Sequence, residues 1–272
     1  MEKIKNPSGT SLLVPSVQEL AKDNKISCVL QRYIQPQLED CTLSEVDTVL
    51  QIPVIDMHRL VSEEFGSSEL VKLHLACKDW GFFQVVNHGV SSSLVENVKM
   101  EIQDFFNLPM SEKKKFWQTP QHMEGFGQAF VLSEDQILDW ADMFYMTTFP
   151  KHSRMPHLFP QLPLPLRQTI YVTLTSSFFV SFACFKSKII TNRTYQSIEH
   201  RAIVNSEKER LSIATFYSPK QDSVIGPVES LISEQNPARF KKIGVEEYFK
   251  NFFARKLEGK SFIDVLRIEH GN

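Results

Sequence analysis

The stretch YQSIEHRAIVNSEKERLSIATF, residues 195–216, is typical of two short β-strands joined by a polar turn. The first strand would carry His200, and Arg210 and Ser212 would follow on the second. Because side chains alternate between the two faces of a strand, Arg210, Ser212 and Phe216 are expected on one face. His200 joins that face only if the connecting loop has an odd number of residues.

Such a face would carry the side chains of a metal and carboxylate site. A neutral imidazole ligates divalent metals, whereas a guanidinium group forks onto a carboxylate and a nearby hydroxyl adds one more hydrogen bond. The face is therefore suited to a dicarboxylate that is held at one end and chelates a metal with the other. Hairpins that expose a histidine and an arginine are common, however, and the spacing alone favours a structural role.

The composition is that of an ordinary globular protein. The 272 residues can bury a large core, either as one big domain or as two small ones, and 42% of them are hydrophobic and 23% charged. A net charge of −2 gives no electrostatic reason to expect nucleic acid or an anionic membrane. The four cysteines form no CxxC pair, and the opening MEKIKNPSGTS lacks the apolar core of a signal peptide. These features predict free thiols and a cytoplasmic location.

One uncharged stretch, QTIYVTLTSSFFVSFACF at residues 168–185, departs from this picture. As a helix it would span roughly 27 Å, just under the thickness of a bilayer core. Serine, threonine, β-branched and aromatic residues are frequent in it, which favours a buried strand over a membrane-spanning helix. A membrane-tethered protein is the least favoured alternative.

The first half of the chain alternates predicted helices and strands. In VPSVQELAKDN, Ser16 is placed to cap a helix and Glu19 occupies the capping-box position. The strand QIPVIDMHRL is followed by a helix, SSELVKLHLACKDW, which ends at Gly81, and by a second strand, FFQVVNHGV. A further amphipathic helix, SSLVENVKMEIQDFFNL, ends at Pro109, and strand-forming residues cluster again over 140–149.

The second half is expected to end in a helix. In the tail, an apolar stripe at helical spacing is formed by Tyr248, Phe249, Phe252 and Phe253. No internal repeat and no low-complexity run is present in the chain.

Taken together, these segments resemble the plant iron(II)- and 2-oxoglutarate-dependent dioxygenases, in particular the senescence-related-gene-like group that includes alkaloid O-demethylases. The N-terminal pieces that carry the resemblance are VPSVQELAK, IPVIDM, ACKDWGFFQVVNHGV, EIQDFFNLPMSEKKKF, EGFGQAF, SEDQILDWADMF and PHLFPQLPLPLRQTI. The C-terminal pieces are IITNRTYQSIEHRAIVNSEKERLSIATFYSP and ARFKKIGVEEYFKNFFARKLEGKSFIDVLRI. They cover most of residues 11–170 and 189–268.

The resemblance implies Fe(II) and 2-oxoglutarate as cofactors, and it implies roles for single residues. His200 matches the second histidine ligand of iron, and Arg210 and Ser212 match the pair that holds the distal carboxylate of 2-oxoglutarate. Phe216 matches a position that the family often gives to an aromatic residue near the substrate. No residue is identified as catalytic beyond these.

The family's remaining iron ligands have no counterpart in this chain. They come as His-x-Asp on an upstream strand, and none of the eight histidines here begins such a motif. Between Ile170 and Lys188 the family has roughly a hundred residues, enough for several strands of a double-stranded β-helix. Here that place holds only YVTLTSSFFVSFACFKS, which resembles none of those strands. It is interpreted as a short foreign stretch that replaces a spliced-out or mis-annotated segment.

Other histidines offer weak substitutes for the missing pair. His122 and Glu124 form the chain's one His-x-acid motif, but it lies in the N-terminal region rather than on a barrel strand. His88 is expected to make a local hydrogen bond in its turn. Structural roles are expected for His58 and His74, and no role is assigned to the loop and tail histidines His152, His157 and His270.

The sequence therefore predicts an α+β protein, in which a mixed helix/strand region joins an incomplete double-stranded β-helix (jelly roll) with a C-terminal helix. The expected divisions are an N-terminal extension (1–50), the dioxygenase N-terminal region (51–167), an apolar junction (168–187) and the C-terminal part of the dioxygenase domain (188–272). The expected function is oxidation, hydroxylation or O-demethylation of a small plant specialised metabolite, with this chain inactive because its iron ligands are incomplete. The alternative is a non-catalytic interaction or regulatory fragment, or a mis-spliced product, that associates with a full-length relative.

Overall fold

The chain forms two compact units. Unit 1 contains Met1–Thr48 and Ser93–Thr175, and unit 2 contains Val49–Ser92 and Ser176–Asn272. The computed structural model describes residues 11–22, 28–35, 51–119, 122–128, 131, 133–168, 170, 185–197, 202, 204–205, 207–220, 222–253 and 261–268. Each unit is described below by itself.

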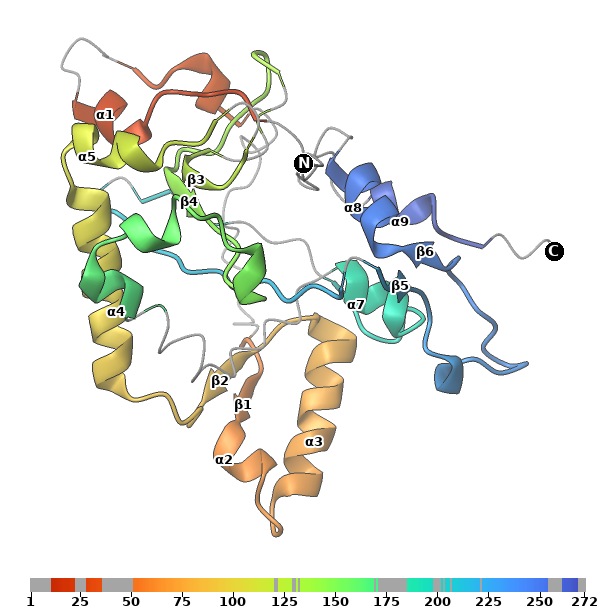
Figure 1. Cartoon of the computed structure of the whole chain (residues 1–272). Helices are drawn as coiled ribbons and strands as arrows, with labels where there is room; N and C mark the ends of the chain where they lie inside the picture. The colour runs from red at the N-terminus through yellow and green to blue at the C-terminus, as the bar shows by residue number, and fades with distance from the viewer. Residues whose placement is uncertain are drawn as a thin grey trace. The chain divides into compact units, whose positions relative to one another are not determined.

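Unit 1 is built around one long helix and a short hairpin (Figure 1). Its helices and turns are α1 (Val17–Lys22), η1 (Gln31–Tyr33), α4 (Ser92–Asn107, whose first residue belongs to unit 2), α5 (Met110–Lys113), η4 (Lys114–Phe116), η5 (Lys151–Ser153), η6 (Phe159–Gln161) and helical residues 164–168. Its strands are β3 (Gly125–Gly127) and β4 (Met143–Tyr145), which pair antiparallel with Phe126 opposite Phe144. The helix predicted to end at Pro109 is confirmed, because proline cannot continue the backbone hydrogen-bond pattern.

The main core of unit 1 is aromatic. Phe105 of α4 packs edge-to-face against Phe116, Phe126 and Phe144, with ring centroids 5.6, 6.4 and 4.9 Å away. Leucines from the proline-rich segment, among them Leu158, complete the cluster. Edge-to-face pairs add to the gain from burial, so α4, β3 and β4 are fixed against one another by this cluster.

The predicted cap of α1 forms, and a carboxylate distant in sequence adds to it. The hydroxyl of Ser16 accepts the backbone N–H of Glu19 at 3.4 Å and donates to the Asp142 carboxylate at 2.6 Å. That carboxylate also accepts the backbone N–H groups of Val17 and Gln18, at 2.9 and 3.1 Å. Asp142 thus satisfies two further N–H groups of the first turn, which a capping box leaves without a partner.

Unit 2 begins with two parallel strands joined through helices. β1 (Val54–Asp56) pairs with β2 (Gln84–Val86), and the connection between them contains α2 (Met57–Leu60), α3 (Gly66–Leu75) and the π-turn η3 (Ala76–Trp80). The helix ends at Gly81, whose φ of 74° is left-handed, as the sequence predicts. The side chain of Cys77 in this connection is buried, and burial raises the pKa of its thiol.

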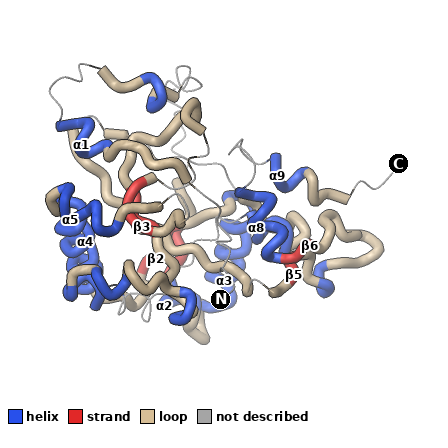
Figure 2. The backbone as a smooth tube through the Cα atoms, turned by 45° about the horizontal axis from the view of Figure 1, so that its top comes forward, coloured by secondary structure: helices blue, strands red, loops and turns tan. Residues whose placement is uncertain are grey.

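The C-terminal part of unit 2 has its own core. Its elements are α7 (Phe185–Ile190), β5 (Val224–Ile225), η7 (Glu229–Leu231), β6 (Ile243–Gly244), α8 (Val245–Phe253) and α9 (Ser261–Asp264). Figure 2 shows β5 and β6 side by side next to α8. Ile189, Ile225 and Tyr248 are among the buried residues of this cluster, and Phe249 packs against it. The predicted C-terminal helix is confirmed; the side chains of Phe252 and Phe253 lie outside the described residues.

The hairpin predicted at residues 195–216 is described only in part. Its second half, residues 207–216, forms no strand, whereas residues 198–201, 203 and 206 lie outside the described residues, so the pairing itself stays a prediction. A strand needs a neighbour for its backbone hydrogen bonds, and no described segment pairs with 207–220. In the described part of the chain, strands form three two-stranded sheets and no closed barrel.

The apolar junction lies mostly outside the described residues, since these include only residues 168, 170 and 185 of the stretch 168–185. The strand expected there stays a prediction. Of the helices in the described ranges, none combines the length and the apolar character needed to cross a membrane.

Candidate functional site

Two of the predicted site residues lie together. Nη1 of Arg210 donates a hydrogen bond to Oγ of Ser212 at 2.7 Å, so both side chains lie on the same side of the chain, as their spacing predicts. Both residues are exposed to solvent.

This pair has the chemistry of a carboxylate clamp. The guanidinium group keeps its other N–H donors, and the serine hydroxyl, which accepts from Arg210, still has its own proton to donate. Charge-assisted hydrogen bonds of this kind are strong where water is excluded and weak where water competes. In the described structure the pair therefore presents hydrogen-bond donors for a carboxylate, but water has access to both side chains.

The other two predicted site residues are not brought to this pair. His200 lies outside the described residues, so its role as an iron ligand stays a prediction. Phe216 exposes 77% of its surface to solvent. Its assignment to the substrate also stays a prediction.

The His-x-acid motif in unit 1 has a structural role. Both carboxylate oxygens of Glu124 accept hydrogen bonds from Thr147, one from its backbone N–H at 2.8 Å and one from its hydroxyl at 2.9 Å. His122 pairs with Thr119 through backbone hydrogen bonds of 3.0 and 3.1 Å. The carboxylate thus fixes the ends of the β3–β4 hairpin, which agrees with the low weight given to it as a ligand.

The described residues do not fit an iron site. Nowhere among them do three histidine, cysteine, aspartate or glutamate side chains come close enough together to hold a metal ion. Nδ1 of His88 accepts the backbone N–H of Val90 at 3.2 Å, which confirms its expected local hydrogen bond. Nδ1 of His74 lies 3.1 Å from the hydroxyl of Tyr195, and this contact supports a structural role.

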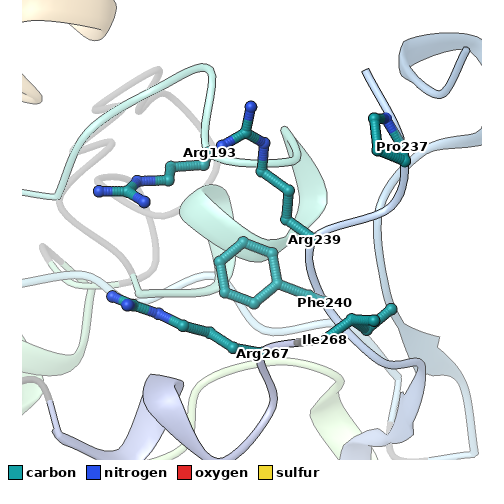
Figure 3. A pocket seen from close by; sticks show the side chains of 6 residues that line it. All are labelled: Arg193, Pro237, Arg239, Phe240, Arg267 and Ile268. Carbon is teal, nitrogen blue, oxygen red and sulfur yellow. The ribbon is translucent and has the colours of Figure 1, made fainter. Parts of the chain in front are cut away.

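A pocket in unit 2 is lined by charged side chains that the sequence analysis did not single out. It has a volume of about 270 Å³ and is lined by Arg193, Pro237, Arg239, Phe240, Arg267 and Ile268 (Figure 3). The three arginines are far apart in the sequence and follow no recognisable spacing. Only the fold brings them together, so no signal in the sequence could have found them.

Comparison with known proteins identifies the family. A sequence model described as the N-terminal region of the non-haem dioxygenases in morphine synthesis matches residues 52–162. Protein SRG1 of Arabidopsis thaliana is 40% identical over 95% of this chain and 98% of its own length. Codeine O-demethylase of Papaver somniferum is 37% identical over 96% of this chain and 98% of its own.

These alignments are longer than the chain itself. The alignment with Protein SRG1 runs over 350 positions, whereas this chain has 272 residues, so at least 78 aligned positions have no residue here. Both ends of the relative are matched, because 98% of its length is covered. The unmatched positions therefore lie mostly inside the alignment.

Solved structures support the same fold. The crystal structure of JOX2 in complex with 2OG, Fe and JA superimposes with a TM-score of 0.76 at 24% identity, over 96% of this chain and 100% of that one. The dioxygenase for auxin oxidation in rice gives 0.60 at 14% identity, over 80% of this chain. Together with the sequence relatives, they show that this chain belongs to the plant 2-oxoglutarate-dependent dioxygenases, in the group of Protein SRG1 and the O-demethylases.

Proposed function

We propose that this chain is a dioxygenase-family protein that retains the residues that bind 2-oxoglutarate but lacks a complete Fe(II) site. It therefore does not catalyse the family's reaction. The family is one of oxidoreductases that act on small molecules, and its members use Fe(II) and 2-oxoglutarate. What is proposed for this chain is the loss of that activity. The observation that carries the proposal is the absence of any His-x-Asp from its sequence.

Two further observations support the proposal. At least 78 positions of the alignment with Protein SRG1 are empty in this chain, enough for several strands and the ligands they carry. In addition, the only His-x-acid motif has its carboxylate engaged with Thr147. A facial triad needs two histidines and one carboxylate, and a single imidazole at His200 does not hold Fe(II) against water.

The retained residues define what the chain would still do. Arg210 and Ser212 would bind a carboxylate weakly, since both are exposed and their charge is screened. The relatives include enzymes named for codeine and for a flavonoid, and we infer a small plant specialised metabolite as the ancestral substrate class. We place the chain in the cytoplasm, in keeping with its composition.

A decarboxylation assay tests the loss of activity. The full chain, incubated with Fe(II), ascorbate and 2-oxoglutarate, is expected to release no more succinate than the same mixture with a chelator, because the described residues supply no triad. The control is a full-length relative such as Protein SRG1, assayed for 2-oxoglutarate decarboxylation in parallel. Iron-dependent succinate from this chain that disappears in His200→Ala would overturn the proposal.

A second candidate function is association with a full-length relative. Residues 207–220 form no strand, and large apolar side chains are exposed there: Ile213 by 55%, Phe216 by 77% and Tyr217 by 64%. A segment that forms no strand and exposes apolar side chains is a template for pairing with another chain. This observation favours an interaction or regulatory fragment over a chain with no role.

Size-exclusion chromatography of a mixture tests the association. This chain and a purified full-length relative are expected to elute together, and the double substitution Ile213→Asp and Phe216→Asp is expected to separate them, because buried charges oppose strand pairing. The matched control is Val265→Asp, which changes an apolar residue of similar exposure, 53%, elsewhere in unit 2. Separate elution of the two wild-type chains would rule this function out.

A further inference from the structure

The pocket in unit 2 gathers three arginines around one aromatic ring. In Figure 3 the ring of Phe240 lies between the side chain of Arg267 on one side and those of Arg193 and Arg239 on the other. Phe240 itself is 2% exposed, and Pro237 and Ile268 complete an apolar wall. The pocket thus has a cationic rim and an apolar floor.

The positive charge of this rim is only partly neutralised. Nη2 of Arg267 donates to Oδ1 of Asp264 at 2.8 Å. For Arg193 and Arg239, no carboxylate in the described ranges forms an ion pair with the guanidinium group. Like charges gathered at one pocket repel one another, so an anion between them would lower the free energy of the site.

A buried asparagine builds this arrangement. Asn192 is 2% exposed; its Nδ2 donates to the carbonyl oxygen of Pro237 at 3.0 Å, and its Oδ1 accepts the backbone N–H of Arg239 at 2.8 Å. One side chain therefore ties the turn that carries Arg193 to the segment that carries Arg239. The backbone segments that carry these two arginines are thus held together.

The third arginine is held to the same framework by backbone hydrogen bonds. The N–H of Ile268 donates to the carbonyl oxygen of Arg239 at 3.0 Å, and the N–H of Lys241 donates to that of Leu266 at 2.8 Å. These hydrogen bonds lie on either side of the antiparallel β-bridge between Phe240 and Arg267. All three guanidinium groups thus extend from segments that are fixed to one another.

The backbone at the pocket's edge is in an uncommon conformation. Asn192 and Arg193 both have left-handed φ angles, 49° and 70°. Arginine in this region is unfavourable by about 1 kcal/mol or more, and such residues cluster where surrounding structure fixes a functional geometry. Here the hydrogen bond from the N–H of Arg193 to the carbonyl oxygen of Lys188, 2.8 Å long, closes the turn.

From this geometry we propose that the pocket binds a small organic anion, whose phosphate or carboxylate group is held by Arg193, Arg239 and Arg267 and whose apolar part lies on Phe240 and Ile268. Guanidinium groups bind such oxyanions through paired hydrogen bonds, and the volume of about 270 Å³ admits a small molecule. The site uses neither His200 nor the Arg210–Ser212 pair, so it is independent of the function proposed above.

Calorimetric titration of the full chain with phenyl phosphate tests this site. Phenyl phosphate carries both features, so it is expected to bind at least about tenfold more tightly than either phenol or inorganic phosphate. Arg193→Gln and Arg239→Gln are each expected to weaken binding about tenfold, and Arg239→Lys less, because lysine keeps the charge but loses the planar fork. The affinity for benzoate, measured in the same way, shows whether the pocket prefers a carboxylate to a phosphate group.

One variant serves as a control. Lys208→Gln removes one exposed positive charge of unit 2 and is expected to bind phenyl phosphate as the wild type does. Circular dichroism of each variant without ligand shows whether it folds like the wild type. If Arg193→Gln does not fold, the result depends on Arg239→Gln, which changes an exposed side chain. Binding no tighter than that of phenol, or an equal loss in Lys208→Gln, would overturn the proposal.

Discussion

The Gly125→Ala substitution is expected to destabilise unit 1 by about 3 kcal/mol or more, which lowers its melting temperature by roughly 6–12 °C. Gly125 is buried in β3 with a φ of 124°, a conformation that L-residues rarely adopt. A Cβ atom there would clash with the carbonyl oxygen of Phe116 and lie 3.2 Å from the backbone N of Gln118. Backbone atoms on both sides cannot move aside without opening the aromatic core. Thermal unfolding followed by circular dichroism measures the effect.

Substitutions at two other glycines distinguish the effect of the steric clash from that of the backbone strain. Gly89 also has a left-handed φ, 75°, but nothing lies within 4 Å of its Cβ position, so Gly89→Ala is expected to cost about 1 kcal/mol. Gly244 has neither the strained φ nor a close neighbour, and Gly244→Ala is expected to leave stability nearly unchanged. If Gly125→Ala melts like Gly244→Ala, the packing of β3 against Phe116 is not as described.

Restoring the missing segment is expected to produce the largest gain in activity. A variant in which residues 171–187 are replaced by the stretch that Protein SRG1 carries at this place would regain the upstream iron ligands expected from the family. Metal-ion catalysis supplies several kcal/mol of transition-state stabilisation, so iron-dependent succinate formation is expected to rise by at least about 100-fold over the unmodified chain. The measurement is the decarboxylation assay described above.

The same variant tests the assigned residues of the chain itself. His200→Ala in the restored protein is expected to return succinate formation to background, and Arg210→Gln is expected to raise the KM for 2-oxoglutarate more than it lowers kcat. A restored protein with the inserted His-x-Asp changed to Ala-x-Ala provides the matched inactive control. A folded restored protein that forms no succinate would show that the missing segment does not explain the proposed loss of activity.

The sequence predicts the local elements of this protein well and its long-range contacts poorly. The helix that ends at Pro109 and the one that ends at Gly81 depend on residues close in the chain, and both form as expected. The cap of α1 depends on Asp142, more than a hundred residues away, and no local pattern indicates it. The second half of the predicted hairpin, residues 207–216, forms no strand, and its pairing with the first half stays a prediction.

In the candidate site, too, the sequence predicts the local contacts and misses the long-range ones. The alignment of Arg210 with Ser212 follows from their spacing, and the structure has them hydrogen-bonded. The anion pocket could not be predicted, because Arg193, Arg239 and Arg267 meet only after the C-terminal core has formed. The engagement of Glu124 by Thr147 is likewise a property of the paired strands β3 and β4 and not of the motif around it.

The two hydrogen bonds of Asn192 couple the turn at Arg193 to the segment before Phe240. Separating the two would leave a buried amide group without these partners, which costs free energy. A molecule held by the arginines would stabilise the joined arrangement. It is therefore expected to slow hydrogen exchange at the backbone N–H of Arg239, which donates to Asn192.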